Sequence, residues 1–161
     1  MNDICGIMKG YYSLLVNIIL PHSAGFIGSY FTISSIKTWY VTINKPSFNP
    51  PSWIFSPVWL SLYTLIGISF YLFHKKDKFK SKKVYIIYGF HLLLNAIWSI
   101  IFFRMHEICF ALVDLLLIIA TLIILMKYFF ASSRMSFYLL IPYLMWVCFA
   151  AILNYNIWML N

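Results

Sequence analysis

Residues 108–130 read ICFALVDLLLIIATLIILMKYFF, and this stretch decides the class of fold. Its charged side chains are Asp114 and Lys127, and the rest is almost entirely apolar. A helix needs about 20 predominantly apolar residues to cross the hydrocarbon core of a bilayer. The stretch therefore predicts a transmembrane helix.

Four other stretches meet the same criterion, at about residues 11–33, 54–73, 84–103 and 137–159. Pro21 lies inside the first and predicts a kink, whereas Pro57 and Pro142 lie near the starts of their spans, where proline is better tolerated. No stretch has the alternating pattern of an outer-membrane β-strand. We predict a single domain over residues 1–161, an all-α integral membrane protein with a bundle of five transmembrane helices.

The composition excludes the other broad classes. Of the 161 residues, 63% are hydrophobic and 10% are charged, whereas a soluble domain carries about 25% charged residues. Disorder requires low hydrophobicity and high charge. Most lysines fall in one loop between apolar stretches. The net charge of +8 therefore indicates the orientation of the chain in the membrane, and we expect no nucleic-acid partner.

The basic residues predict the orientation in the membrane. With five spans, the N-terminus and the second and fourth loops share one side. That side holds nine of the 12 basic residues, namely Lys9, Lys75, Lys76, Lys78, Lys80, Lys82, Lys83, Lys127 and Arg134. The positive-inside rule places this side, with the N-terminus, in the cytoplasm of a bacterial-type cell membrane and the C-terminus outside.

The first loop, residues 34–53, is long for so compact a chain and reads SSIKTWYVTINKPSFNPPSW. The tandem Pro50-Pro51 excludes a helix interior, and Trp39, Tyr40 and Trp53 give the loop apolar surface. Two interpretations stay open: a segment anchored at the membrane interface by aromatic residues, or a lid over the mouth of the bundle.

Aromatic residues recur at helical spacing in the second and fifth spans. Phe55, Trp59, Tyr63 and Ile66 share one helix face, and so do Trp146, Phe149, Ala150 and Leu153. Such faces serve either helix packing and interfacial belts or the wall of a pocket for a flat, apolar ligand.

The third span adds polar side chains to an aromatic face, with His91, Asn95, Trp98 and Phe102 in helical register. Polar groups in a membrane usually face the bundle interior. Asn95 could join helices by hydrogen bonds or orient a ligand. Asp114 is an isolated carboxylate, for which we expect a hydrogen bond between helices rather than a proton relay.

Metal sites and the common catalytic motifs are not indicated. Cys5, Cys109 and Cys148 are widely spaced, and His22 and His91 show no metal-ligand spacing. The sequence lacks a glycine-rich phosphate loop and an HExxH motif. We therefore expect no metal and no cofactor.

Four ordered motifs resemble those of the translocator protein or tryptophan-rich sensory protein family (TspO/MBR, also called peripheral-type benzodiazepine receptors). They are WYVTINKPSFNPPSWIFSPVWLSLY at residues 39–63, HLLLNAIWSIIFF at 91–103, ALVDLLL at 111–117 and IPYLMWVCFAAILNYNIW at 141–158. The resemblance extends over residues 21–158. It implies a five-helix bundle whose first loop covers a ligand pocket, in a receptor or sensor linked to porphyrin transport or homeostasis.

The resemblance also implies the ligands and the site. The family binds porphyrins such as protoporphyrin IX, and in animals sterols and benzodiazepine-type drugs, and its members commonly form homodimers. Carried over to this sequence, the pocket comprises Tyr40, Trp59, Tyr63, Asn95, Trp98, Trp146 and Ala150. An alternative activity, light- and oxygen-dependent porphyrin breakdown, would assign catalytic roles to Trp59 and Trp146. Met159 replaces the basic residue of the animal sterol-recognition pattern, which argues against sterol binding.

Overall fold

The computed structural model describes residues 2–76 and 81–161, with side chains described from residue 10 onward. The side chains of Lys9, Lys78 and Lys80, which entered the orientation argument, lie outside this part. The described elements, in chain order, are α1 (Asn2–Ile36), η1 (Ser52–Ile54), α2 (Phe55–Lys76), α3 (Lys82–Ser99), η2 (Ile100–Arg104), α4 (Ile108–Ser132), α5 (Arg134–Leu139) and α6 (Ile141–Leu160).

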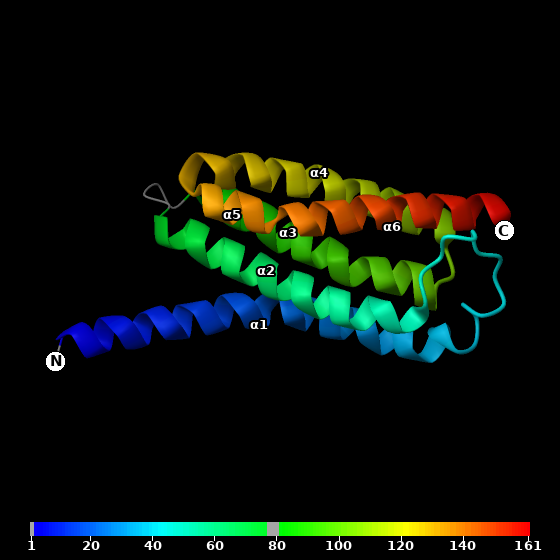
Figure 1. Ribbon diagram of the computed structural model, residues 1–161, viewed down its shortest axis with the longest axis horizontal. Helices are drawn as coiled ribbons and strands as arrows, with labels where there is room; N and C mark the ends of the chain where they lie inside the picture. The colour runs from blue at the N-terminus through cyan, green and yellow to red at the C-terminus, as the bar shows by residue number, and fades with distance from the viewer. Residues whose placement is uncertain (1, 77–80) are drawn as a thin grey trace.

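The predicted fold class is confirmed. In the described part of the chain, five helical segments are long and apolar enough to cross a membrane: Gly10–Ile36, Ser52–Lys76, Lys82–Arg104, Ile108–Ser132 and Arg134–Leu160. They run side by side along the molecule (Figure 1). Large apolar side chains such as Phe26, Ile86 and Met145 are more than two-thirds exposed, as expected of surfaces that face lipid.

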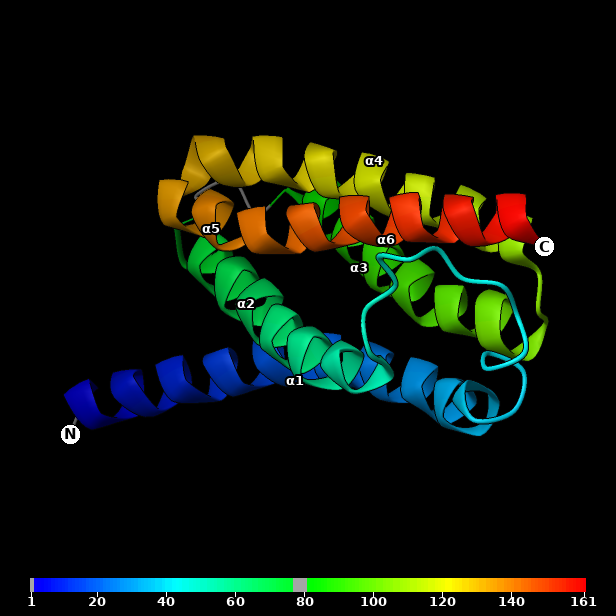
Figure 2. The same cartoon turned by 45° about the vertical axis from the view of Figure 1, so that its right-hand side comes forward.

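The helices form a bundle, and a long loop lies at one of its ends. Figure 2 shows α4 and α6 along one side, α1 along the opposite side, and α2 and α3 between them. Residues 37–51, between α1 and η1, form a loop that we call the lid. The lid lies at the end of the bundle that carries the C-terminus, away from the N-terminal end of α1 (Figures 1 and 2).

α1 is longer than the predicted span and changes direction near its middle (Figure 1). Pro21 lies inside this helix and has no N–H to donate to the Asn17 carbonyl. That carbonyl lies against α2, because a Cβ on Gly67 would be 2.6 Å from the Asn17 oxygen and 2.7 Å from the Ile18 Cα. The proline and the glycine together let the two helix backbones approach closely.

The third and fifth spans depart from regular α-helix. The third ends in the π-helical segment η2, in which the Met105 N–H donates to the Ile100 carbonyl at 3.0 Å. The fifth, predicted as one helix, is divided at Leu140 into α5 and α6. Pro142 falls in the first turn of α6, where the missing N–H costs no intrahelical bond.

Candidate ligand cavity beneath the lid

A cavity of about 1090 Å³ lies between α1, α2, α3, η2 and α6. Its wall includes Ile18, His22, Gly25 and Ile36 of α1; Tyr40 of the lid; Phe55, Trp59, Tyr63 and Thr64 of α2; Asn95, Trp98, Phe102 and Phe103 of α3 and η2; and Trp146, Ala150, Leu153 and Asn154 of α6. Small-molecule sites are concave, mostly apolar and about 300–1,000 Å³ in volume. The cavity is therefore large enough for a ligand bigger than a typical drug.

All seven residues predicted for the pocket line this cavity. The aromatic faces of the second and fifth spans meet there: Trp59 stacks on Tyr63 with ring centroids 5.3 Å apart, and Phe55 packs edge-on against Trp146 at 6.1 Å. Six of the eight residues on these two faces line the cavity, whereas Ile66 and Phe149 do not.

The segment η2 extends the aromatic face predicted for the third span, because it adds Phe103, which the sequence analysis missed, to Trp98 and Phe102. Trp98 stacks on Phe102 at 5.2 Å, and Phe103 lies edge-on to both rings. The π-helical turn places the consecutive residues Phe102 and Phe103 on the cavity wall together. A π-helix is not detectable from hydrophobic spacing, although such turns are frequent at functional sites.

Asn95 lines the cavity, but its amide is engaged inside the bundle. Its Nδ2 donates to the His91 carbonyl at 2.8 Å, and its Oδ1 accepts from the Tyr143 hydroxyl at 2.9 Å. The Tyr143 oxygen also lies 3.0 Å from His91 Nε2, and His91 Nδ1 lies 2.8 Å from the Thr121 hydroxyl. Asn95 therefore joins α3 to α6, and His91 and Tyr143 hold its orientation.

Three buried polar atoms in residues of the cavity wall have no hydrogen-bond partner in the described structure: the indole nitrogens of Trp98 and Trp146, and Oδ1 of Asn154. An unpaired buried donor or acceptor costs about 1–3 kcal/mol. These atoms have almost no accessible surface, so neighbouring side chains cover them and they do not face the open cavity. Asn154 was missed in the sequence analysis, although its position on the Trp146–Ala150–Leu153 face was a usable signal.

Most serine and threonine hydroxyl groups on the wall are engaged in hydrogen bonds within their own helices. Ser23, Ser29, Thr32 and Thr64 each donate to a carbonyl three or four residues earlier in their own helix. These bonds leave the side-chain methyl groups and rings to dominate the wall. The cavity therefore favours a ligand that is largely apolar with few polar atoms.

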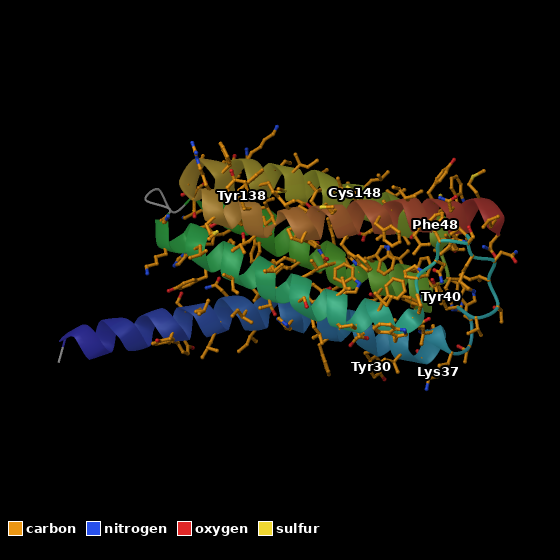
Figure 3. The ribbon with its side chains drawn as sticks, viewed as in Figure 1. Tyr30, Lys37, Tyr40, Phe48, Tyr138 and Cys148 are labelled. Carbon is orange, nitrogen blue, oxygen red and sulfur yellow. The ribbon has the colours of Figure 1, made fainter. Side chains whose placement is uncertain are left out.

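The lid closes the cavity with Tyr40. This side chain is 5% exposed, packs against Phe102 and Phe103, and donates its hydroxyl hydrogen to Asn49 Oδ1 at 2.7 Å. Burial raises the pKa of Tyr40 to about 12, so the phenol stays neutral at physiological pH. Figure 3 shows Tyr40 and Phe48 at the same end of the bundle, opposite Tyr138.

The lid is tied to the bundle at several points. Trp39 stacks on His106 with ring centroids 4.3 Å apart, while Lys45 Nζ donates to the carbonyls of Tyr40 and Ile43 within the lid itself. The Asn161 side chain pairs with the backbone N–H and carbonyl of Asn44, at 2.9 and 3.0 Å. These contacts support the lid interpretation, while Trp53, 72% exposed, is placed as an interfacial anchor would be.

Asp114 was expected to form a hydrogen bond between helices. The side chain is buried on α4, and its Oδ2 has no hydrogen-bond partner in the described structure. The predicted bond between helices is not made by this oxygen. Asp114 is not among the residues that line the cavity.

The fold and the cavity together define an all-helical, multi-pass membrane protein with an aromatic cavity beneath a lid. Comparison with known proteins narrows this class. The sequence model of the TspO/MBR family matches residues 17–159, and the chain belongs to this family.

Its relatives come from distant organisms. The chain is 38% identical to the tryptophan-rich protein TspO of Archaeoglobus fulgidus over 92% of its own length and 96% of that protein. It is 36% identical to the tryptophan-rich protein TspO of Chlorobaculum tepidum, over 95% and 98% of the two chains. It is 35% identical to the translocator protein of Bos taurus, over 89% and 86%.

Proposed function

We propose that the protein is a membrane receptor or sensor that binds a tetrapyrrole, such as protoporphyrin IX, in the cavity beneath the lid, and that it takes part in porphyrin transport or homeostasis. The observation that carries the proposal is the agreement between cavity and ligand chemistry. A flat, conjugated macrocycle matches a wall of stacked aromatic rings. The cavity volume of about 1090 Å³ accommodates such a macrocycle.

The proposed binding residues are the seven of the sequence analysis, with different roles. Trp59, Tyr63, Trp98 and Trp146 supply aromatic surface, Ala150 leaves space, and Tyr40 closes the site. Asn95 fixes the spacing of α3 and α6 through its bonds to His91 and Tyr143.

Titration of the purified protein in nanodiscs with protoporphyrin IX tests the proposal through tryptophan fluorescence. Three of the six tryptophans, Trp59, Trp98 and Trp146, line the cavity. We expect saturable quenching with one tetrapyrrole per chain. A linear, non-saturating decrease, like that given by free tryptophan in the same nanodiscs, would contradict the proposal.

A second candidate function is light- and oxygen-dependent breakdown of the bound porphyrin, using Trp59 and Trp146. The observation that favours it is that both indoles belong to the cavity wall, where a bound photosensitiser could oxidise them. Its test is loss of the porphyrin absorption bands under light and oxygen. The loss should vanish in Trp59→Phe and Trp146→Phe if the protein catalyses it, and persist in both variants if the photochemistry is free.

Two further proposals concern the assembly and its surroundings. We propose that the protein forms homodimers in the bilayer, as the family resemblance implies. We also propose that the end of the bundle with Lys75, Lys76, Lys82, Lys83, Lys127 and Arg134 faces the cytoplasm of a bacterial-type cell membrane. Sterol-like and benzodiazepine-type ligands are alternative occupants of the same cavity, and competition with protoporphyrin IX measures their relative affinities.

A further inference from the structure

His22 is a half-buried histidine on the cavity wall, directly after Pro21 in α1. Its Nδ1 lies 2.8 Å from the Ile18 carbonyl oxygen. A carbonyl oxygen only accepts hydrogen bonds, so Nδ1 carries the proton in this contact. In the neutral imidazole, Nε2 therefore has a free lone pair.

Among the described side chains, the hydrogen-bonding neighbour of Nε2 is Thr64, whose hydroxyl hydrogen is directed elsewhere. The Thr64 hydroxyl oxygen lies 3.4 Å away, a long contact. The same hydroxyl lies 2.9 Å from the Leu60 carbonyl, to which it donates its single hydrogen. Nε2 thus has one long contact, with a hydroxyl whose hydrogen is directed to another acceptor, in a largely apolar wall.

The other histidines differ from His22. His91 is 1% exposed, and both its ring nitrogens lie within hydrogen-bond distance of other side chains, Thr121 and Tyr143. His74 and His106 are exposed and are not among the cavity-lining residues. Among the described residues, His22 is therefore the one histidine that lines the cavity, and its Nε2 has only the long contact with Thr64.

We propose that His22 Nε2 is the axial ligand of a metallated tetrapyrrole, such as iron protoporphyrin IX, bound in the cavity. A neutral imidazole whose Nδ1–H donates to a backbone carbonyl is the arrangement that orients metal-ligating histidines and raises their basicity. This inference rests on the proposed function and narrows it, because it selects metallated over metal-free tetrapyrroles.

The surroundings of His22 favour a metal that brings its own donors. Among the described residues, no three His, Cys, Asp or Glu side chains come together to hold a metal ion. A macrocycle supplies four equatorial nitrogens, so one imidazole completes an axial site. The Tyr63 ring, 6.0 Å from the His22 ring, belongs to the aromatic wall beside it.

The cavity also sets the coordination number. Its described lining contains no Cys, no Met and no second His that could bind the opposite face of the metal. Ferric haem should therefore be five-coordinate and high-spin, and ferrous haem should take carbon monoxide opposite the imidazole. Resonance Raman spectra of the ferrous form should show an iron–histidine stretching band.

The test compares hemin with metal-free protoporphyrin IX on the wild type, His22→Ala and His22→Gln, the last of which keeps a donor for the Ile18 carbonyl. We expect both variants to lose the iron–histidine band and at least about tenfold in hemin affinity, a larger loss than in their affinity for protoporphyrin IX. Added imidazole should restore a histidine-type spectrum to His22→Ala. His74→Ala, which changes a histidine outside the cavity, is the matched control and should behave like the wild type.

The outcomes separate the two proposals. An unchanged iron–histidine band in His22→Ala or His22→Gln overturns axial ligation by His22 and leaves tetrapyrrole binding in place. Hemin that binds the wild type without this band also overturns it. If neither hemin nor protoporphyrin IX binds the wild type saturably, the proposed function fails, and the axial ligand fails with it.

Discussion

At the scale of the residue, Asn95 shows what the sequence predicts about a side chain and what it does not. Its spacing from His91, Trp98 and Phe102 placed it correctly on the inward face of α3, because polar side chains avoid lipid. Its partner Tyr143 could not be foreseen, since it lies 48 positions away on another helix. The contact depends on the register between α3 and α6, which periodicity within each helix does not determine.

The Tyr143 hydroxyl is the group that we expect to contribute most to this register. Tyr143→Phe removes the donor to Asn95 Oδ1 and the oxygen beside His91 Nε2, and leaves both atoms buried. We predict a loss of about 1–3 kcal/mol in the free energy of unfolding, measured by denaturation in detergent. Tyr138→Phe is the control, because Tyr138 is 53% exposed. Equal stability of the two variants would contradict a structural role for the Asn95–Tyr143–His91 group.

His22 illustrates the same limit for the site. The sequence contains four histidines without metal-ligand spacing, and that pattern gave no reason to expect a protein-only metal site. The property that distinguishes His22 is the direction of its Nδ1 hydrogen bond. This direction depends on the local geometry of α1 and on the approach of Thr64 from α2.

At the scale of the element, the composition predicted which segments are helical. It predicted the irregularities within those helices only in part. Runs of apolar residues predicted five spans, and Pro21 predicted the bend in α1. The division between α5 and α6 and the π-helical end of the third span were missed. Both depend on how a helix end packs in the assembled bundle, which no local pattern records.

The close contact of α1 with α2 gives a prediction at this scale. Gly67→Ala would place a Cβ 2.6 Å from the Asn17 carbonyl oxygen, and rigid backbone atoms must move to accommodate it. We predict a destabilisation of about 1–3 kcal/mol. At Gly89 a Cβ would meet nothing within 4 Å, so Gly89→Ala should stabilise its helix by about 0.5–1 kcal/mol. Thermal unfolding of both variants in detergent tests the pair, and a stabilising Gly67→Ala would contradict the close approach.

The lid is the second element with a specific prediction. Asn161→Ala removes the two hydrogen bonds that its side chain makes to the Asn44 backbone. Each such bond contributes about 0.5–1.5 kcal/mol, so we expect protoporphyrin IX to dissociate several-fold faster in stopped-flow measurements. Asn156→Ala is the matched control, because the Asn156 amide donates to a carbonyl of its own helix. Equal dissociation rates in both variants would show that the lid does not retain the ligand.

At the scale of the whole molecule, the sequence predicted the class of protein most completely. The low charged fraction and the length of the apolar runs leave few alternatives to a helical membrane bundle. The existence of a cavity was an interpretation that competed with simple helix packing. It depends on how far apart α1 and α6 are held, which is a property of the complete bundle.

The orientation of the molecule gives the prediction at this scale. A single cysteine placed at Asn161, in a chain whose three native cysteines are replaced by alanine, should react with a membrane-impermeant maleimide in intact cells. A single cysteine at Lys75 should react only after the membrane is permeabilised. The reverse pattern would contradict the placement of the lysine-rich end in the cytoplasm.

The central claim is that a tetrapyrrole binds inside the cavity rather than on the lipid-facing surface. Ala150→Trp adds an indole to the cavity wall, whereas Ile152→Trp adds the same group to a position on α6 that is 57% exposed. The most direct test is the equilibrium dissociation constant of protoporphyrin IX for the wild type and the two variants. The account predicts at least about a tenfold weaker affinity in Ala150→Trp, equivalent to about 1.4 kcal/mol, and an unchanged affinity in Ile152→Trp. Wild-type affinity in Ala150→Trp, with the variant folded, would contradict it.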